Sequence, residues 1–258
     1  MTVITLATDF GTADGYVGAM KGVILGIAPA VQLVDLSHEI AGQDVRGASW
    51  VLNCAAPFFP RGSVHLAVVD PGVGGRRRPL VIVTEWASYV GPDNGLFTFA
   101  LEEAGVAVFE LDQPEYWLPN VSRTFHDRDV FAPVAAHVAQ GVAPHRLGSP
   151  IADPVRLSSV APERHSDGHV TGTVIHVDRF GNLITDIPGG WLDVGGWRVG
   201  VAGRQISQVS LTYADAAPGE LLALVSSAGT LEIAERNGNA AAGLCVGVGA
   251  AVTLWSES

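Results

Sequence analysis

The chain has 258 residues, 48% of them hydrophobic and 16% charged, so it carries enough apolar surface for a packed core and is not a disordered protein. Its formal net charge of −11 argues against nucleic acid or an anionic membrane as a partner, because both need clustered lysines and arginines. No basic segment follows Met1, and glycines and prolines break the apolar stretches before they reach the length of a bilayer span. Cys54 and Cys245 are far apart and lack metal-site spacing, so we expect two buried thiols in a soluble, cytoplasmic protein.

Strands and helices alternate in the first half of the chain. Short apolar runs predict strands, and apolar residues repeated every three or four positions predict helices. The predicted strands cover residues 3–7, 31–36, 64–69, 80–84, 88–90 and 106–111, and the predicted helices cover residues 16–27, 45–55, 96–103 and 130–138. We expect Asp14 to cap the first helix and Asp127 or Asp129 to cap the last. This alternation predicts a mostly parallel sheet with helices on both faces.

The pattern changes near residue 150. A polar connector is followed by short β-like runs at residues 170–177, 183–187, 197–202, 221–225, 231–234 and 251–255. Glycine and asparagine turns separate these runs, which is typical of a small antiparallel barrel or sandwich. We therefore predict an α/β fold class with two domains. A mostly parallel α/β sandwich domain covers residues 1–155, a linker covers about residues 156–167, and an antiparallel β-barrel-like domain covers residues 168–258.

The segment VVDPGVGGRRR, residues 68–78, is the strongest candidate for a functional loop. An apolar strand leads to Asp70, and the proline and glycines that follow exclude helix or strand there. Arg76, Arg77 and Arg78 then come within reach of the same carboxylate. Loops at the carboxyl ends of parallel strands hold the ligand sites of open α/β sheets. An ion pair that only holds the loop in place is the alternative for these residues.

Further polar loops at residues 8–14, 92–95 and 124–129 would gather along the same edge of the sheet. Asp9 is either a turn residue or an acceptor for the two hydroxyls of a ribose. The chain has no GxGxxG or GxxxxGK[ST] segment, so a pyrophosphate site is not supported. His38, His65 and His126 lack the spacing of paired metal ligands, and no GxSxG segment marks a serine hydrolase.

Six segments follow one another as TDFGTADGYVGAMKGVI, VDLSHEI, VVDPGVGGRRR, GPDNGLF, TFHDRDVFAP and VDRFGNLITDI. Together they resemble the S-adenosyl-L-methionine (SAM) hydrolases, also called SAM hydroxide adenosyltransferases, a family related to the fluorinases and chlorinases. The resemblance covers nearly the whole chain. It implies an α/β domain followed by a β-barrel-like domain, and a homotrimer in which SAM lies between one subunit's N-terminal domain and a neighbour's C-terminal domain.

The resemblance also implies roles for single residues. Halogenases lack the acid at the position of Asp70, so its presence favours water over halide as the nucleophile. Ala228 stands where halogenases carry an arginine, and Tyr16 stands where they carry a small hydroxyl residue. Asn182 could instead hold a turn, and Phe180 could be a core aromatic residue. The implied catalytic residues are Asp70, Arg77 and His126, and the implied substrate-binding residues are Asp9 (ribose), Asp178 (methionine amino group), Phe180 and Asn182 (adenine) and Ser227 (methionine carboxylate).

The implied reaction is the attack of water on C5′ of SAM, which gives adenosine and L-methionine. Water is a poor nucleophile, so it must be oriented and deprotonated. We expect Asp70 and Arg77 to hold the geometry and a neutral His126 to take the proton, although the reverse division is possible. We expect no metal and no organic cofactor. A SAM-dependent 5′-halogenase and a non-catalytic adenosine or SAM sensor are the alternatives.

Overall fold

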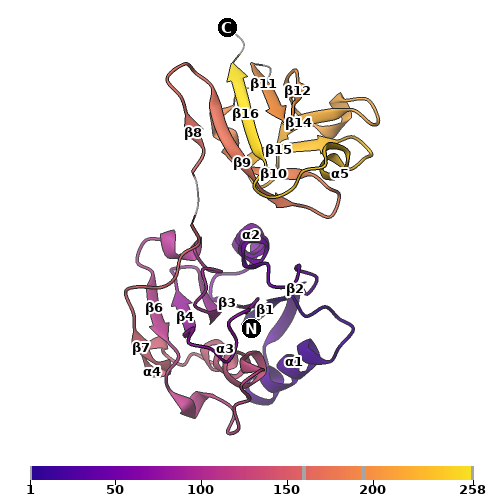
Figure 1. Ribbon diagram of the computed structural model, residues 1–258. Coiled ribbons are helices and arrows are strands. Elements are labelled where there is room, and N and C mark those ends of the chain that lie inside the picture. The colour runs from indigo at the N-terminus through magenta and orange to yellow at the C-terminus, as the bar shows by residue number, and fades with distance from the viewer. Residues whose placement is uncertain (1, 159–160, 193–195, 257–258) are drawn as a thin grey trace. The chain divides into compact units, whose positions relative to one another are not determined.

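The computed structural model describes residues 2–158, 161–192 and 196–256 and divides the chain into two compact units, Met1–Leu157 and Ser158–Ser258. The first unit is an α/β unit in which helices cover a sheet of parallel and antiparallel strands, and the second unit is built almost entirely of strands (Figure 1). The predicted fold class is therefore confirmed. Part of the segment expected as a linker belongs to the second unit, because β8 (Glu163–Arg164) pairs with β9 (Val170–Val177).

The first unit contains a seven-stranded sheet in the order β2-β1-β3-β5-β4-β6-β7. Strands β2, β1, β3 and β5 are parallel neighbours, whereas β4 is antiparallel to both β5 and β6, and β7 is antiparallel to β6. Three of the six pairings are therefore parallel, so the prediction of a mostly parallel sheet is wrong. The parallel half of the sheet is the half that carries the candidate loops at its carboxyl edge. The strands are β1 (Val3–Thr8), β2 (Gln32–Ser37), β3 (Ser63–Val68), β4 (Pro79–Val83), β5 (Ala87–Pro92), β6 (Ala107–Glu110) and β7 (Ser149–Pro150).

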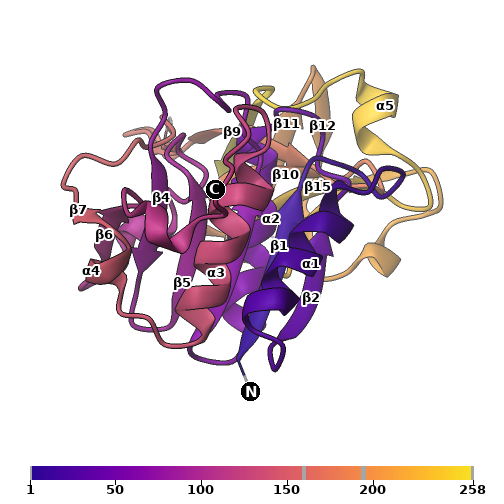
Figure 2. The same cartoon turned by 90° about the horizontal axis from the view of Figure 1, so that it is seen from below.

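Helices cover both faces of this sheet. Met20 of α1 (Tyr16–Ile27) and Val134 of α3 (Ala132–Ala139) pack with Leu66 of β3 in one apolar cluster, and Figure 2 shows these two helices side by side. Leu52 of α2 (Val45–Ala55) packs with Ala67 of β3 in a second cluster on the opposite face. Successive residues of β3 therefore point to opposite faces, and both faces are buried. The shorter helical segments are η1 (Ala56–Phe58), η2 (Ala100–Glu102), η3 (Pro114–Tyr116), η4 (Asp127–Phe131) and α4 (Pro144–Leu147).

Two further predictions for the first unit are wrong. Residues 96–103 are not a regular helix: a series of turns leads into η2, and Thr98 donates its hydroxyl to the carbonyl of Gly95 at 2.6 Å. None of the three predicted acids caps a helix. The residue before α1 is Gly15, and Asp127 and Asp129 lie inside the first turn of η4, which is a π-helix.

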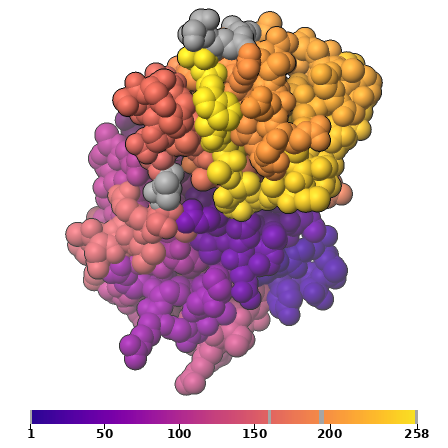
Figure 3. Space-filling model, turned by 45° about the horizontal axis from the view of Figure 1, so that its top comes forward, coloured from indigo at the N-terminus to yellow at the C-terminus, as the bar shows by residue number. Residues whose placement is uncertain are grey.

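The second unit contains a nine-stranded, mainly antiparallel sheet around its own apolar cluster. Its main order is β12-β11-β16-β9-β10-β15-β14-β13, and β8 pairs with β9. Figure 3 shows the C-terminal strand β16 at the surface, next to the segments of β9 and β11 with which it pairs. The remaining elements are β10 (Leu183–Pro188), η5 (Gly189–Trp191), β11 (Trp197–Val201), β12 (Arg204–Ile206), β13 (Val209–Ser210), η6 (Tyr213–Asp215), β14 (Leu221–Val225), β15 (Thr230–Glu235), α5 (Ala240–Leu244) and β16 (Ala251–Ser256).

The two cysteines are free thiols, one in each unit. The expectation that both are buried is wrong, because Cys54 is half-buried and Cys245 is exposed just after α5. Within the part of the chain that the structure describes, no helix is both long and apolar enough to cross a bilayer.

Candidate active site

Two loops at the carboxyl edge of the first sheet carry acids directly after parallel strands. Asp9 follows β1, and Asp70 follows β3 after one intervening residue. The turn after β5 supports the second of these loops, because the Asn94 side-chain amide donates to the carbonyl of Val69 at 2.8 Å. The strand order therefore places Asp9 and Asp70 on neighbouring strands at one edge.

Asp70 and Arg77 form a nearly buried ion pair within one glycine-rich loop. Arg77 donates from Nε to Asp70 Oδ2 at 2.7 Å and also contacts that oxygen through Nη2 at 2.5 Å. The other oxygen, Oδ1, accepts from the backbone N–H of Gly72 at 3.1 Å. The two side chains are only 4% and 10% exposed, and the guanidinium lies 5.0 Å above the buried ring of Phe131. This packing fixes both charges in position.

His126 joins this pair from a distant loop. Its Nδ1 lies 3.0 Å from Nη2 of Arg77. A guanidinium can only donate, so Nδ1 accepts and the neutral ring carries its proton on Nε2. Burial, and then the positive charge of Arg77, lower the pKa of His126 below its usual value, so the ring is neutral at pH 7. The structure thus brings together the three residues that the sequence analysis selected as catalytic.

The neighbouring arginines do not share Asp70, contrary to the expectation for all three. Arg78 donates to Asp93 Oδ2 at 2.9 Å and to Asp153 Oδ1 at 2.8 Å, and Arg76 is exposed. Asp93 is buried and also accepts from the backbone N–H of Val155. Arg78 therefore closes the base of the loop, and Arg77 is the arginine that contacts Asp70 and His126.

Asp127 is a candidate that the sequence analysis treated only as a possible helix cap. It is 4% exposed, and its Oδ1 is buried without a hydrogen-bond partner in the described part of the chain. Burial, followed by the negative charge of Asp70, raises the pKa of Asp127 to about 7, and Asp9 adds to the effect. Asp127 thus belongs to the same electrostatic cluster as Asp70, Arg77 and Asp9. The sequence signal that could have marked Asp127 is its position directly after the candidate histidine His126.

Asp9 is held by the loop before α2. Its Oδ2 accepts from the backbone N–H of Gln43 at 2.8 Å, and Gln43 adopts a positive φ of 66°. This contact satisfies part of one carboxylate oxygen and leaves acceptor capacity for a diol. Phe10, Tyr16 and Phe125 pack edge to face near this loop, with centroids 5.3 to 6.3 Å apart, and Tyr16 is 50% exposed.

The loop between β9 and β10 positions three of the predicted substrate-binding residues. Asp178 accepts from the backbone N–H of Phe180 and of Asn182, and from the Asn182 side-chain amide, each at 2.9 Å. The Asn182 side chain is buried and donates to Asp178, so it holds this turn. Phe180 is 73% exposed, so it is not a core aromatic residue of the second unit, as the alternative interpretation had it. An exposed phenyl ring on a tight, hydrogen-bonded loop is suited to stacking on a flat ligand.

Ser227 lies at the exposed turn between β14 and β15. The turn is closed by bonds from the Ser226 N–H to the Thr230 carbonyl at 2.8 Å and from the Gly229 N–H to the Ser226 carbonyl at 2.9 Å. Among the described residues, the Ser227 side chain makes no hydrogen bond to the loop that holds Asp178. Among the residues that the structure describes, no group of three or more His, Cys, Asp or Glu side chains is arranged to hold a metal ion.

Comparison with known proteins places these features in a family. The model of the SAM hydroxide adenosyltransferase N-terminal domain matches residues 4–148, and that of the C-terminal domain matches residues 172–253. An (R)-S-adenosyl-L-methionine hydrolase from Thermus thermophilus is 40% identical over 98% of this chain and 100% of that protein. The crystal structure of an uncharacterized conserved protein from Thermotoga maritima has a TM-score of 0.90 and 37% identity, covering 97% of this chain and 99% of that one. A fluorinase from an Actinoplanes species is more distant, at 29% identity over 72% of this chain and 71% of that protein. The chain belongs to the SAM hydroxide adenosyltransferase family.

Proposed function

We propose that this protein hydrolyses SAM to adenosine and L-methionine by attack of water on C5′ of the ribose. The observation that carries the proposal is the chain of contacts from Asp70 through Arg77 to His126 at the carboxyl edge of the sheet. Relatives named (R)-S-adenosyl-L-methionine hydrolase are 40% identical to this chain, which supports the R configuration at the sulfonium of its substrate. Neither a metal ion nor an organic cofactor takes part in the proposed reaction.

The hydrogen bonds support the reverse of the division of roles that the sequence suggested. Because His126 accepts from Arg77 at Nδ1, its Nε2 carries a proton and can donate to the oxygen of a water molecule but cannot take a proton from it. Asp70 keeps a free lone pair on Oδ1, which accepts from the Gly72 N–H, whereas Oδ2 is engaged by both the Nε and the Nη2 of Arg77. We therefore assign proton acceptance to Asp70 and orientation of the water to His126.

The proposed step balances as follows. The water oxygen forms a bond to C5′, and the electron pair of the C5′–S bond moves to sulfur, which leaves as the neutral thioether of methionine. One proton of the water moves to Asp70, and the other stays on the new 5′-hydroxyl. The water becomes strongly acidic as its bond to carbon forms, so a carboxylate suffices as the acceptor. Because the sulfonium loses its charge in this step, a site that excludes bulk water favours the transition state.

Substrate binding is proposed for residues of both units. Asp9 holds the ribose diol with the acceptor capacity that Gln43 leaves free. Phe180 stacks on the adenine ring, and Asp178 and Asn182 contact the methionine amino group and the adenine edge. Ser227 contributes to binding of the methionine carboxylate.

We further propose that the protein is a cytoplasmic homotrimer in which each site takes Asp70 from one subunit and Phe180 from its neighbour. The exposure of Phe180, at 73%, supports a surface role for this ring. The exposed free thiol of Cys245 is compatible with a reducing compartment.

The reaction is tested by incubating the protein with (R)-SAM in ¹⁸O-labelled water and analysing the products by chromatography and mass spectrometry. We expect equimolar methionine and adenosine, with the label in the adenosine 5′-hydroxyl, because water attacks carbon and not sulfur. Asp70→Asn should lower kcat at least about 100-fold, which is the scale of losing a group that acts on the reacting atoms, while adenosine still binds in calorimetry. Asp153→Asn is the matched control, because Asp153 pairs with Arg78 outside the catalytic set and is exposed; its kcat should stay at the wild-type value.

Other outcomes separate the alternatives. A 5′-halo-adenosine formed from SAM and chloride or fluoride would show a halogenase instead. Tight adenosine binding without release of methionine over hours would show a sensor. Equal turnover in the wild type and Asp70→Asn would remove Asp70 from the mechanism even if SAM is hydrolysed.

A further inference from the structure

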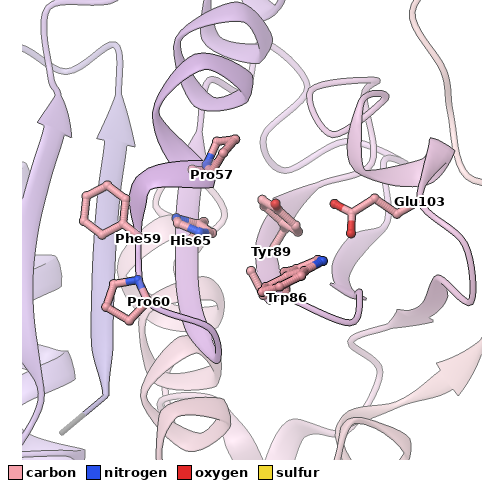
Figure 4. Close-up of a pocket in the computed structure, with 9 residues that line it drawn as sticks. Pro57, Phe59, Pro60, His65, Trp86, Tyr89 and Glu103 are labelled. Carbon is pink, nitrogen blue, oxygen red and sulfur yellow. The ribbon is translucent and has the colours of Figure 1, made fainter.

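A cavity lies at the amino ends of β3 and β5, the edge of the sheet opposite to the loop that carries Asp70. It has a volume of about 280 Å³. Ligand sites of open α/β sheets lie at the carboxyl edge, so the proposed reaction leaves this cavity without a role. Among the residues that line it are Pro57, Phe59, His65, Trp86, Tyr89 and Glu103, shown in Figure 4.

Four of the nine residues that line the cavity carry aromatic rings. His65 and Tyr89 are register partners on adjacent parallel strands, and their rings stack with centroids 5.1 Å apart. Phe59 packs edge-on against His65 at 5.7 Å. Trp86, just before β5, is 60% exposed and lines the cavity as well. The cavity therefore offers π-systems held in place by the sheet.

One acidic group at this cavity has no counter-charge. Glu103 extends toward Trp86 and Tyr89 (Figure 4), and its carboxylate makes no ion pair or hydrogen bond with the residues that the structure describes, although its backbone N–H donates to the carbonyl of Ala100. Two nearby acids in the sequence are neutralised, since Glu85 pairs with Arg61 at 3.1 Å and Glu102 pairs with Arg156 at 3.2 Å.

The buried imidazole at the base of the cavity adds no positive charge. His65 is 1% exposed, and its Nδ1 forms a hydrogen bond of 2.7 Å with the hydroxyl of Thr5. Burial lowers the pKa of His65 to about 4, so its ring is neutral at pH 7. The guanidinium of Arg61 lies 5.1 Å from the centre of the Trp86 ring, but its charge is paired with Glu85, so the unpaired Glu103 gives the cavity a net negative charge.

We propose that this cavity is a binding site for a small alkylated ammonium ion. Aromatic faces attract a cation through their quadrupole, and an alkylated ammonium also buries its methyl groups against the rings. Glu103 supplies the matching negative charge. A primary ammonium would need three hydrogen-bond acceptors, and the aromatic and proline walls do not supply them. This site is separate from the reaction proposed above and does not depend on it.

The test is calorimetric titration of the full-length protein with choline and with its neutral isostere 3,3-dimethylbutan-1-ol. Each titration is run without adenosine and again with saturating adenosine, which occupies the proposed active site. We expect choline to bind about tenfold more tightly than the isostere, because the two differ only in charge. Glu103→Gln should remove most of this difference, whereas the matched variant Glu102→Gln should keep it. Trp86→Ala should weaken choline binding, and its melting temperature shows whether the variant is folded.

Each other result overturns the proposal. Equal affinity for choline and the isostere would show a purely apolar cavity. An unchanged choline affinity in Glu103→Gln would place the cation elsewhere. Equal losses in Glu103→Gln and Glu102→Gln would show a general effect of surface charge. Loss of choline binding when adenosine is added would show that choline binds at the active site.

Discussion

Asp127 is buried where its charged form is unfavourable. The unfolded chain has a carboxyl pKa near 3.8, and burial followed by repulsion from Asp70 raises that pKa to about 7 in the folded protein. The folded state therefore binds a proton more tightly than the unfolded state does. The stability that comes from this proton is fully present below pH 3.8 and is lost as the pH rises through 7.

Asp127→Asn should remove this loss, because asparagine resembles the protonated acid in size and does not ionise. The free energy of unfolding of the variant, relative to the wild type, should increase by about 2–3 kcal/mol between pH 5 and pH 8, the change given by the two pKa values. Urea unfolding at the two pH values measures it. A difference between variant and wild type that does not change with pH would show that Asp127 keeps one protonation state over this range.

Asp129→Asn is the control for the direction of the pH effect on stability, because Asp129 is buried in the same π-helix. Burial alone would raise the pKa of Asp129, but hydrogen bonds from Arg128 and from the Ser122 N–H outweigh it and lower that pKa. This variant should lose stability relative to the wild type at pH 8 and should lose less at low pH. The two neighbouring acids should therefore respond in opposite directions.

The sequence could predict that Asp70, Arg77 and His126 lie together, but not which acid each of the three arginines contacts. Strand register decides these contacts: Pro79 of β4 pairs with Pro92 of β5, so Arg78 meets Asp93 and only Arg77 faces Asp70. The register of an antiparallel pair depends on contacts far apart in the chain, and nothing local in three consecutive arginines reveals it. The proton position on His126 could likewise be assigned only once Arg77 was seen to donate to it.

Elements with a strong local period were predictable to within one or two residues. Helix α1 and strand β9 have the predicted bounds, 16–27 and 170–177. The run at residues 96–103 is apolar enough for a helix, but Thr98 bonds to the carbonyl of Gly95 and also accepts from the backbone of Leu157. Such side-chain bonds compete with helix formation. Strands of two or three residues, such as β8 and β12, carry no period of their own and exist only through their partners.

The loop from Asp70 to Arg77 depends on Gly74. Gly74 has a φ of +73°, and a Cβ there would overlap the carbonyl oxygen of Arg123, three residues before His126. Gly74→Ala should therefore separate the two loops that carry the proposed catalytic residues Asp70, Arg77 and His126. We expect kcat for SAM hydrolysis to fall at least about tenfold, since small displacements of catalytic groups are costly, together with a loss of stability.

Gly105→Ala is the matched control for this loop. Gly105 also has a φ of +73°, but a Cβ there would meet no atom within 4 Å. It should lose about 1–2 kcal/mol of stability from the left-handed backbone alone and keep full kcat. Similar kcat values in the two variants, measured well below both melting temperatures, would show that the approach of Gly74 to Arg123 does not position the catalytic residues.

At the scale of the molecule, the chain builds two units with separate apolar clusters. The change from helical to strand periodicity near residue 150 predicted this division, because each pattern buries its own apolar face. The residues proposed for one site are split between the units: the catalytic set lies in the first and the Asp178 loop in the second. A single sequence could not show whether one chain or several complete the site, since periodicity reports only how each unit packs internally.

Mixing two inactive variants tests the proposed trimer. Asp70→Asn disables only the first unit, and Phe180→Ala, at an exposed position, disables only the second. If each site takes its two parts from neighbouring subunits, an equimolar mixture refolded together should recover about one quarter of the wild-type activity. In a random trimer, each of the two parts of a site comes from the variant in which it is intact in about half of the cases, so both are intact in about a quarter of the sites. The assay uses SAM below KM, where loss of Phe180 is most visible. Activity no higher than the mean of the two separate variants would show that each chain completes its own site, and light scattering of the mixture would show whether trimers had formed.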